Sequence, residues 1–129
     1  MKKVIALLSV AIFTAAIFAF AAEDTKSELR PAQKVMQARV AWLAAINKNL
    51  SAKNFEDVAK DANELSAQTK RVGENLTNPL GKELDLAISL LAKDVSAAAA
   101  RQDSETVKAK LGAIKGKCSE CHVKIRDKK

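Results

Sequence analysis

Positions that are mostly apolar recur every three or four residues through the middle of this chain, and this spacing constrains the fold more than any other feature. It is clearest in the segment 55–76, where the stripe consists of Phe55, Val58, Ala62, Leu65, Thr69, Val72 and Leu76. Residues three and four apart lie on one face of an α-helix, whereas a strand requires alternation with a period of two. The segment is therefore predicted to be an amphipathic helix, weakened at Gly73.

The same spacing predicts three further helices. The first covers about residues 27–50, the third begins at residue 79 and the fourth follows the turn "RQDS" and runs towards the C-terminus. Their stripes are Met36, Val40, Leu43, Ile46 or Asn47, and Leu50 in the first, Leu80, Leu84, Ala87 or Ile88, Leu91, Val95 and Ala98 in the third, and Val107, Leu111, Ile114, Cys118, Cys121 and Ile125 in the fourth. Four such helices with short loops predict an all-α fold, an antiparallel four-helix bundle.

The predicted helix starts carry their own signals. Asn54 and Asn78 stand where N-caps are expected, and either Asp103 or Ser104 caps the fourth helix. Pro31 and Pro79 suit the first turn of a helix, because the missing N–H of proline costs nothing there.

The first 21 residues have the features of a secretory signal peptide. "MKK" is positively charged, a long apolar run follows, and Ala19-Phe20-Ala21 fits the small-x-small cleavage pattern. We expect cleavage after Ala21, with Ala22 as the other option. Residues 22–129 would then form one bundle domain with no membrane attachment. An uncleaved membrane anchor is the alternative, because the apolar run is somewhat long.

Charge and aromatic content narrow the classes of protein to which the chain can belong. Without the two lysines of the signal, 20 basic side chains face 15 acidic ones, which is not the dense basic patch of a nucleic-acid binder. The same 108 residues hold only two aromatic side chains, Trp42 and Phe55. A domain this small has little apolar surface to bury, so we expect another group to fill part of its interior.

The sequence "CSECH" near the C-terminus is the attachment motif of a c-type haem. In such sites two cysteines form thioethers to the porphyrin vinyl groups, and the histidine supplies a nitrogen to the iron. Cys118 and Cys121 fall on the apolar stripe of the fourth helix, so they and His122 are predicted to point into the bundle. A covalently bound haem c would then explain the shortage of aromatic side chains.

Three other interpretations of the cysteines have less support. A thioredoxin-like redox pair requires a βαβ context, which the helical pattern does not provide. A structural zinc site requires four ligands, usually Cys or His, and the chain has two cysteines and one histidine. A structural disulfide fits an exported protein but explains neither His122 nor the low aromatic content.

The motif at the end of a four-helix chain resembles the class II c-type cytochromes, namely cytochrome c-prime and its low-spin relatives. "CSECHVKIR" matches the family pattern of C-x-x-C-H followed by an aromatic and a basic residue, except that Ile125 replaces the aromatic. By this resemblance Arg126 lies near the proximal face of the haem; its plain interpretation is a solvated residue at a helix C-terminus.

The first predicted helix carries a second resemblance. "KVMQARVAWLAAI" is similar to the family stretch that lies over the distal haem face, and Met36 matches its methionine. His122 is the only histidine, so the resemblance implies either His122/Met36 six-coordinate iron or five-coordinate iron. The plain interpretation of Met36 is a flexible core side chain. Trp42 and Leu43 are interpreted as core packing.

These ligand sets imply different functions. Six-coordinate iron fits a periplasmic electron-transfer protein, whereas five-coordinate iron fits a cytochrome c-prime-like binder of NO or CO. No catalytic set is visible, so the chain is not predicted to be an enzyme. The basic fourth helix is either a solvated face or a surface that attracts an acidic redox partner. By the resemblance the protein is a monomer or a homodimer. Gly112 and Gly116 suggest a close approach of the backbone to a neighbouring helix or to the porphyrin.

Overall fold

A computed structural model describes residues 30–127. Four helices follow one another: α1 (Pro31–Ser51), α2 (Phe55–Asn75), α3 (Pro79–Ala100) and α4 (Ser104–Cys121). A short π-helix, η1 (His122–Arg126), continues α4. The described residues contain no strand, so the predicted all-α fold is confirmed.

The signal peptide predicted at residues 1–21 and the cleavage sites after Ala21 and Ala22 lie outside the described residues. The same holds for residues 27–29, where the first helix was predicted to begin; the described part of α1 begins at Pro31. No helix between residues 30 and 127 is both long and apolar enough to cross a membrane.

Side-chain caps begin three of the helices, as the sequence predicts. Asn54 accepts a hydrogen bond from the backbone N–H of Asp57, and Asn78 accepts one from the N–H of Gly81. Asp103, not Ser104, is the cap of α4, and its carboxylate accepts bonds from both the N–H and the hydroxyl of Thr106. Each cap satisfies a backbone donor that has no partner within its helix.

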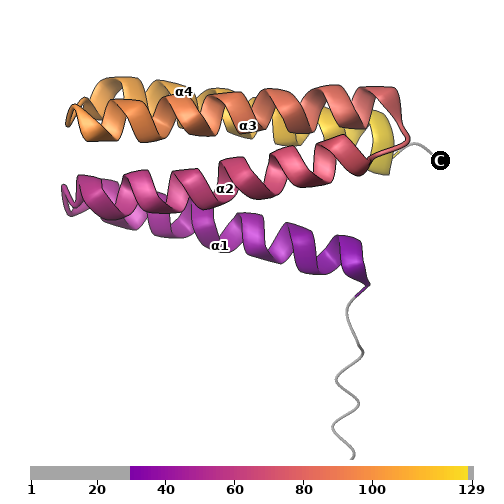
Figure 1. The fold of residues 1–129 in the computed structure, drawn as a ribbon, viewed down its shortest axis with the longest axis horizontal. Helices are drawn as coiled ribbons and strands as arrows, with labels where there is room; N and C mark the ends of the chain where they lie inside the picture. The colour runs from indigo at the N-terminus through magenta and orange to yellow at the C-terminus, as the bar shows by residue number, and fades with distance from the viewer. Residues whose placement is uncertain (1–29, 128–129) are drawn as a thin grey trace, which may run out of the picture.

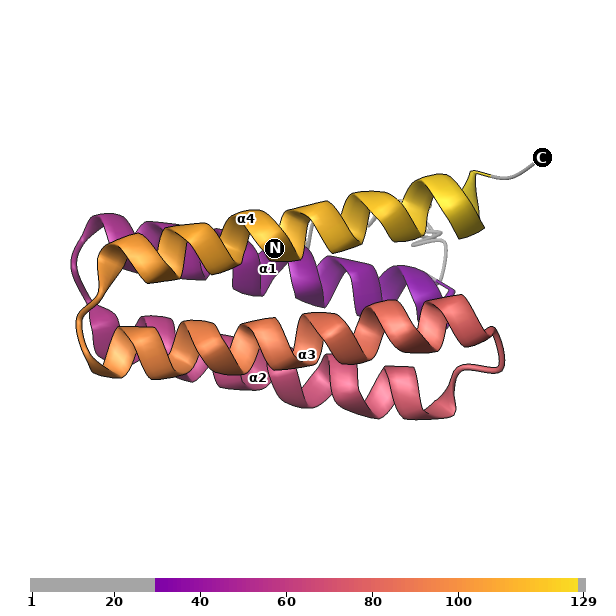
Figure 2. The same ribbon diagram turned by 90° about the horizontal axis from the view of Figure 1, so that it is seen from above.

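The helices run up and down beside one another (Figures 1 and 2). α2 and α3 pack most closely, α3 also packs on α4, and α1 packs on α2. In Figure 1 α1 slants away from the other helices towards its N-terminal end. Within the described residues, α1 and α4 hardly approach each other, so one side of the bundle is left open.

The core consists mainly of small and medium aliphatic side chains from all four helices. Its largest fully buried members include Ile46, Val58, Leu65, Ile88, Val95, Val107 and Ile114. Polar groups in the core are paired: Ser66 and Ser89 donate to each other's backbone carbonyl at 2.9 Å across the contact of α2 and α3. Trp42 and Leu43 are partly buried against this core, as predicted.

The predicted apolar stripe of α1 is wrong at two positions. Val40 is 67% exposed and Met36 is 38% exposed, whereas the buried residues of α1 are Arg39 and Ile46. The physical reason is that α1 packs on α2 and not on α4, so the side of α1 that carries Met36 and Val40 faces the open side of the bundle. Met36 is therefore not a core residue of the described structure.

The suggestion that Gly112 and Gly116 allow a neighbouring helix to approach is also wrong. A Cβ atom at either position would meet no atom of another element within 4 Å. Close approach occurs instead at Gly73, which is buried in α2, because a Cβ there would lie 3.0 Å from the Cβ of Asp85 in α3.

The different surroundings of Gly112 and Gly73 predict opposite effects of alanine substitution on the free energy of unfolding. Gly112→Ala should raise the free energy of unfolding by about 1 kcal/mol, because alanine loses less backbone entropy in a helix. Gly73→Ala should lower the free energy of unfolding by about 1 kcal/mol. The added methyl group would crowd Asp85, and this cost outweighs the gain in backbone entropy. Urea unfolding of both variants tests this, and equal shifts in one direction would contradict the packing described here.

Candidate functional site

The two cysteines lie in a cavity of about 130 Å³ at the end of the bundle where α1 slants away. Its lining comes from three parts of the chain: Met36, Arg39, Val40 and Leu43 of α1, Asp85 and Ile88 of α3, and Cys118, Cys121 and His122 of α4 and η1. Four of the five predicted site residues are thus brought together, although Met36 and His122 are far apart in the sequence.

Cys118 and Cys121 are both free and half-buried, one helical turn apart. Cys118 also packs against the core cluster, which continues the stripe of Leu111 and Ile114. Burial raises the pKa of both thiols. The nearby Asp85 carboxylate raises the pKa of each thiol further, while the Arg39 guanidinium opposes this shift. Cys118 and Cys121 are therefore both neutral thiols at neutral pH.

His122 stands where the hydrogen-bond pattern of α4 changes. The N–H of Asp127 donates to the carbonyl of His122 at 2.9 Å, a bond that spans five residues instead of four. The following Ile125 packs beside Gly81, so that its Cδ1 would lie 3.5 Å from a Cβ at that position. Turns of this kind occur at helix C-termini. This turn and the Ile125 contact fix the backbone around His122, whose half-buried side chain lines the cavity.

Arg126 does not line the cavity. Its side chain is exposed and donates to the carboxylate of the neighbouring Asp127, with Nε 2.7 Å from Oδ1. The structure thus agrees with the plain interpretation of a solvated residue at the helix end, and its role beside a haem stays a prediction.

The cavity wall contains an ion pair that the sequence interpretation missed. Arg39 of α1 donates two hydrogen bonds to Asp85 of α3, at 2.9 and 2.7 Å, and both side chains are almost fully buried. The Nε of Arg39 donates to Gln68 of α2 at 3.0 Å. Gln68 in turn donates to the carbonyl of Val35 at 3.4 Å. This network joins α1 to both of the neighbouring helices.

A signal for this pair was present in the sequence. Arg39 lies three residues after Met36 and four before Leu43, which places it on the same helix face. Asp85 likewise lies three residues before Ile88 of the α3 stripe. The spacing alone fits Arg39 and Val40 equally well, and hydrophobicity favoured Val40.

The buried pair makes a prediction for stability. Asp85→Ala should lower the free energy of unfolding by about 3–5 kcal/mol, because Arg39 is left as a buried charge without its counter-ion. The double variant Arg39→Met/Asp85→Leu should recover most of this loss.

The exposed pair Lys70–Glu74, with a separation of 3.8 Å, provides the matched control. Glu74→Ala should change the free energy of unfolding by less than about 1 kcal/mol. Denaturant titration compares the variants. An Asp85→Ala variant as stable as Glu74→Ala would refute the structural role assigned to the pair.

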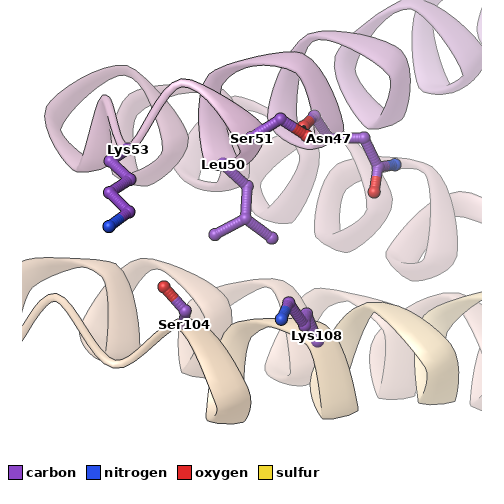
Figure 3. Close-up of a pocket in the computed structure, with 6 residues that line it drawn as sticks. All are labelled: Asn47, Leu50, Ser51, Lys53, Ser104 and Lys108. Carbon is purple, nitrogen blue, oxygen red and sulfur yellow. The ribbon is translucent and has the colours of Figure 1, made fainter.

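Two further hollows lie between α1 and α4 beside the cavity, and together with it we call them the α1–α4 groove. Next to the cavity is a hollow of about 260 Å³, lined by Val40, Leu43, Ala44, Asn47, Leu111 and Lys115. Beyond it is a hollow of about 500 Å³, lined by Asn47, Leu50, Ser51, Lys53, Ser104 and Lys108 (Figure 3). Neighbouring hollows share Val40 and Leu43 or Asn47, so the three lie next to one another.

The residues present fit a covalently attached haem. Two free thiols and His122 lie on one side of the cavity, and Met36, Val40 and Leu43 form an apolar wall opposite them. The cavity alone is smaller than most ligand sites, but the adjoining groove provides further apolar space. Within residues 30–127, no three His, Cys, Asp or Glu side chains are grouped so that they could hold a metal ion by themselves.

Comparisons of the chain with protein-family models, with curated proteins and with solved structures found no match.

Proposed function

We propose that the protein is a periplasmic monohaem c-type cytochrome of the class II kind, which transfers electrons and is not an enzyme. One haem c would be bound through Cys118 and Cys121, with His122 and Met36 as axial ligands of the iron. The observation that carries the proposal is that these four side chains, from α1 and from α4 and η1, line one cavity.

The two cysteines would attach the group. Each thiol adds across a vinyl double bond: sulfur bonds to one vinyl carbon and the hydrogen ends on the other, without oxidant or reductant. Cys118 and Cys121 are neither paired with each other nor fully buried, so both sulfur atoms are accessible from the cavity. Their spacing of three residues places them on one edge of α4.

His122 and Met36 would be the two protein ligands of the iron. A haem supplies an iron that accepts and returns one electron, and a methionine ligand raises its reduction potential above that of a bis-histidine site. His122 is held by the backbone bond from Asp127 and by the packing of Ile125 on Gly81. Met36 has a flexible side chain on the part of α1 that slants away from the bundle, so it can adjust to a bound group.

A five-coordinate binder of NO or CO is the second candidate function. The observation that favours it is the composition of the wall opposite His122, where Val40 and Leu43 lie beside Met36. If Met36 only packs over the haem, this wall offers an apolar surface with no hydrogen-bond donor except the ion-paired Arg39.

Optical spectra of the exported protein distinguish the two functions. The wild type should show sharp low-spin bands when reduced and no change with CO, because Met36 occupies the second axial position. Met36→Ala should show broad high-spin bands that shift with CO. Val123→Ala is the matched control, since Val123 is 63% exposed on η1 and does not line the cavity.

The same experiment has outcomes that contradict the proposal. A wild type that already binds CO would replace electron transfer by the second function. Cys118→Ala/Cys121→Ala should lose covalent haem while remaining helical. Wild-type protein without any haem bands would refute the whole proposal and leave the disulfide interpretation of the cysteines.

We also propose an acidic redox partner. Basic residues predominate on α4 and η1: Lys108, Lys110, Lys115, Lys117, Lys124 and Arg126, against Glu105 and Glu120. Lys117 and Lys124 share the single carboxylate of Glu120, at 3.3 and 2.6 Å, so a net positive charge remains beside the cysteine-bearing turn. A group of positive charges attracts an acidic surface and speeds its approach.

This charge predicts a dependence on ionic strength. Electron exchange with an acidic protein partner should become at least several-fold slower between low and high salt, because screening shortens the reach of the field. Stopped-flow mixing measures the rate, with an uncharged reductant as the control. If the rate with the acidic partner is as insensitive to salt as the control, the steering role is wrong.

A further inference from the structure

The first two turns of α1 carry Met36 but contain no buried side chain. From Pro31 to Ala38 every residue is exposed or half-buried, and the first buried residue of the helix is Arg39. The next one, Ile46, follows two turns later on the same face. A buried apolar stripe normally holds a helix to its neighbours, and this part of α1 lacks one. Its position therefore depends on Arg39.

Arg39 is held on two sides. Its guanidinium donates two hydrogen bonds to the carboxylate of Asp85 on α3, and its Nε donates to Gln68 on α2. Among the described residues, α1 lies close to α2 but hardly approaches α3, so the long Arg39 side chain spans the distance between α1 and α3. A planar guanidinium with two parallel bonds to a carboxylate has one favoured orientation. The pair thus fixes the place of Arg39 relative to α3.

The same network reaches the residue next to Met36. Gln68 accepts from Arg39 and donates to the backbone carbonyl of Val35 at 3.4 Å. Met36 lies one residue after Val35 and three before Arg39, so it lies between two residues that the network holds. Arg39 also lines the cavity together with Met36 and His122. A shift of this part of α1 would therefore move Met36 relative to His122.

We propose that Arg39, held by Asp85 and Gln68, is a positioning residue of the iron site. It keeps the first turns of α1 against the bundle, so that Met36 stays within reach of the iron. This inference rests on the proposed function, in which Met36 is an axial ligand. Without the network the first turns of α1 would separate from α2 and α3, while Ile46 keeps the rest of the helix in place. The core would remain, and the iron would lose Met36.

Arg39→Ala/Asp85→Ala tests the proposal in the exported haem protein. It removes both charges together, so neither is left buried and unpaired. The two cysteines and His122 are intact, so haem should still be attached. The fraction of iron that binds CO should rise at least about tenfold over the wild type, because the population with Met36 in place falls.

Val58→Ala is the control for a general loss of stability. Val58 is fully buried in α2 and does not line the cavity. Its truncation should lower the denaturation midpoint and leave the spectrum low-spin and insensitive to CO.

A second measurement needs no haem. Cys118→Ala/Cys121→Ala removes both cysteines of the chain, so a single new thiol can be followed by its rate of alkylation. Ala38 and Ala45 are both half-buried on α1, two turns apart, and each directly precedes one of the two buried residues of the helix. In this background, removal of the ion pair should speed alkylation of Ala38→Cys at least about tenfold and leave that of Ala45→Cys unchanged.

Gln68→Ala keeps the test available if the variant without the ion pair does not fold. It leaves the ion pair in place and removes the hydrogen bonds of Gln68 to Arg39 and Val35. It should speed alkylation of Ala38→Cys and raise the fraction of CO-binding iron, each by about threefold, because fewer hydrogen bonds are lost.

The outcomes separate the role of Arg39 from the proposed function. If the wild type is low-spin and removal of the ion pair leaves it low-spin, the positioning role is wrong and electron transfer stands. If the wild type carries no haem or already binds CO, the positioning of Met36 falls with the proposed function, while faster alkylation at Ala38→Cys would still show that Arg39 holds α1. Unchanged alkylation at Ala38→Cys, or equal acceleration at Ala38→Cys and Ala45→Cys, would refute the role of Arg39 in either case.

Discussion

The hydrogen-bonded ion pair of Arg39 and Asp85 is the interaction on which the rest of the structure depends. It fixes α1 to α3 through two hydrogen bonds, and Gln68 fixes the same guanidinium to α2. Removing two charges from water is costly, so such a pair is retained only where geometry and hydrogen bonds compensate. Here the pair joins α1 to α2 and α3, while α1 and α4 hardly approach each other.

The cysteine motif lies at the open side of the bundle. α4 follows an ordinary apolar stripe through Val107, Leu111 and Ile114 into the core, and the next two positions of the stripe are cysteines. Because α1 slants away at that end, these positions face a cavity instead of a packed helix. The wall opposite consists of α1 side chains that would be buried in a closed bundle. The accessibility of the two thiols therefore follows from the slant of α1.

Much of the local structure could be predicted from the sequence. The helix starts at Phe55 and Pro79 and the caps at Asn54, Asn78 and Asp103 follow from residues within one turn of each other. Most core positions of α2, α3 and α4 also follow, although Leu76 is 37% exposed and the core residues Ala92 and Ala99 of α3 were not predicted. Prediction failed on α1, where Arg39 and Val40 fit the stripe equally well and hydrophobicity pointed to the wrong one.

The sequence by itself determined the four helices, their caps and the place of Cys118, Cys121 and His122 on the inner face of the last helix, because each depends on spacing within a single helix. Only the tertiary structure decided which face of α1 is buried, since the partner of Arg39 lies 46 residues away on α3. It also decided that Met36 faces the cysteines across a cavity, and that Arg126 points away from it. Both follow from how whole helices pack, and no local pattern encodes that packing.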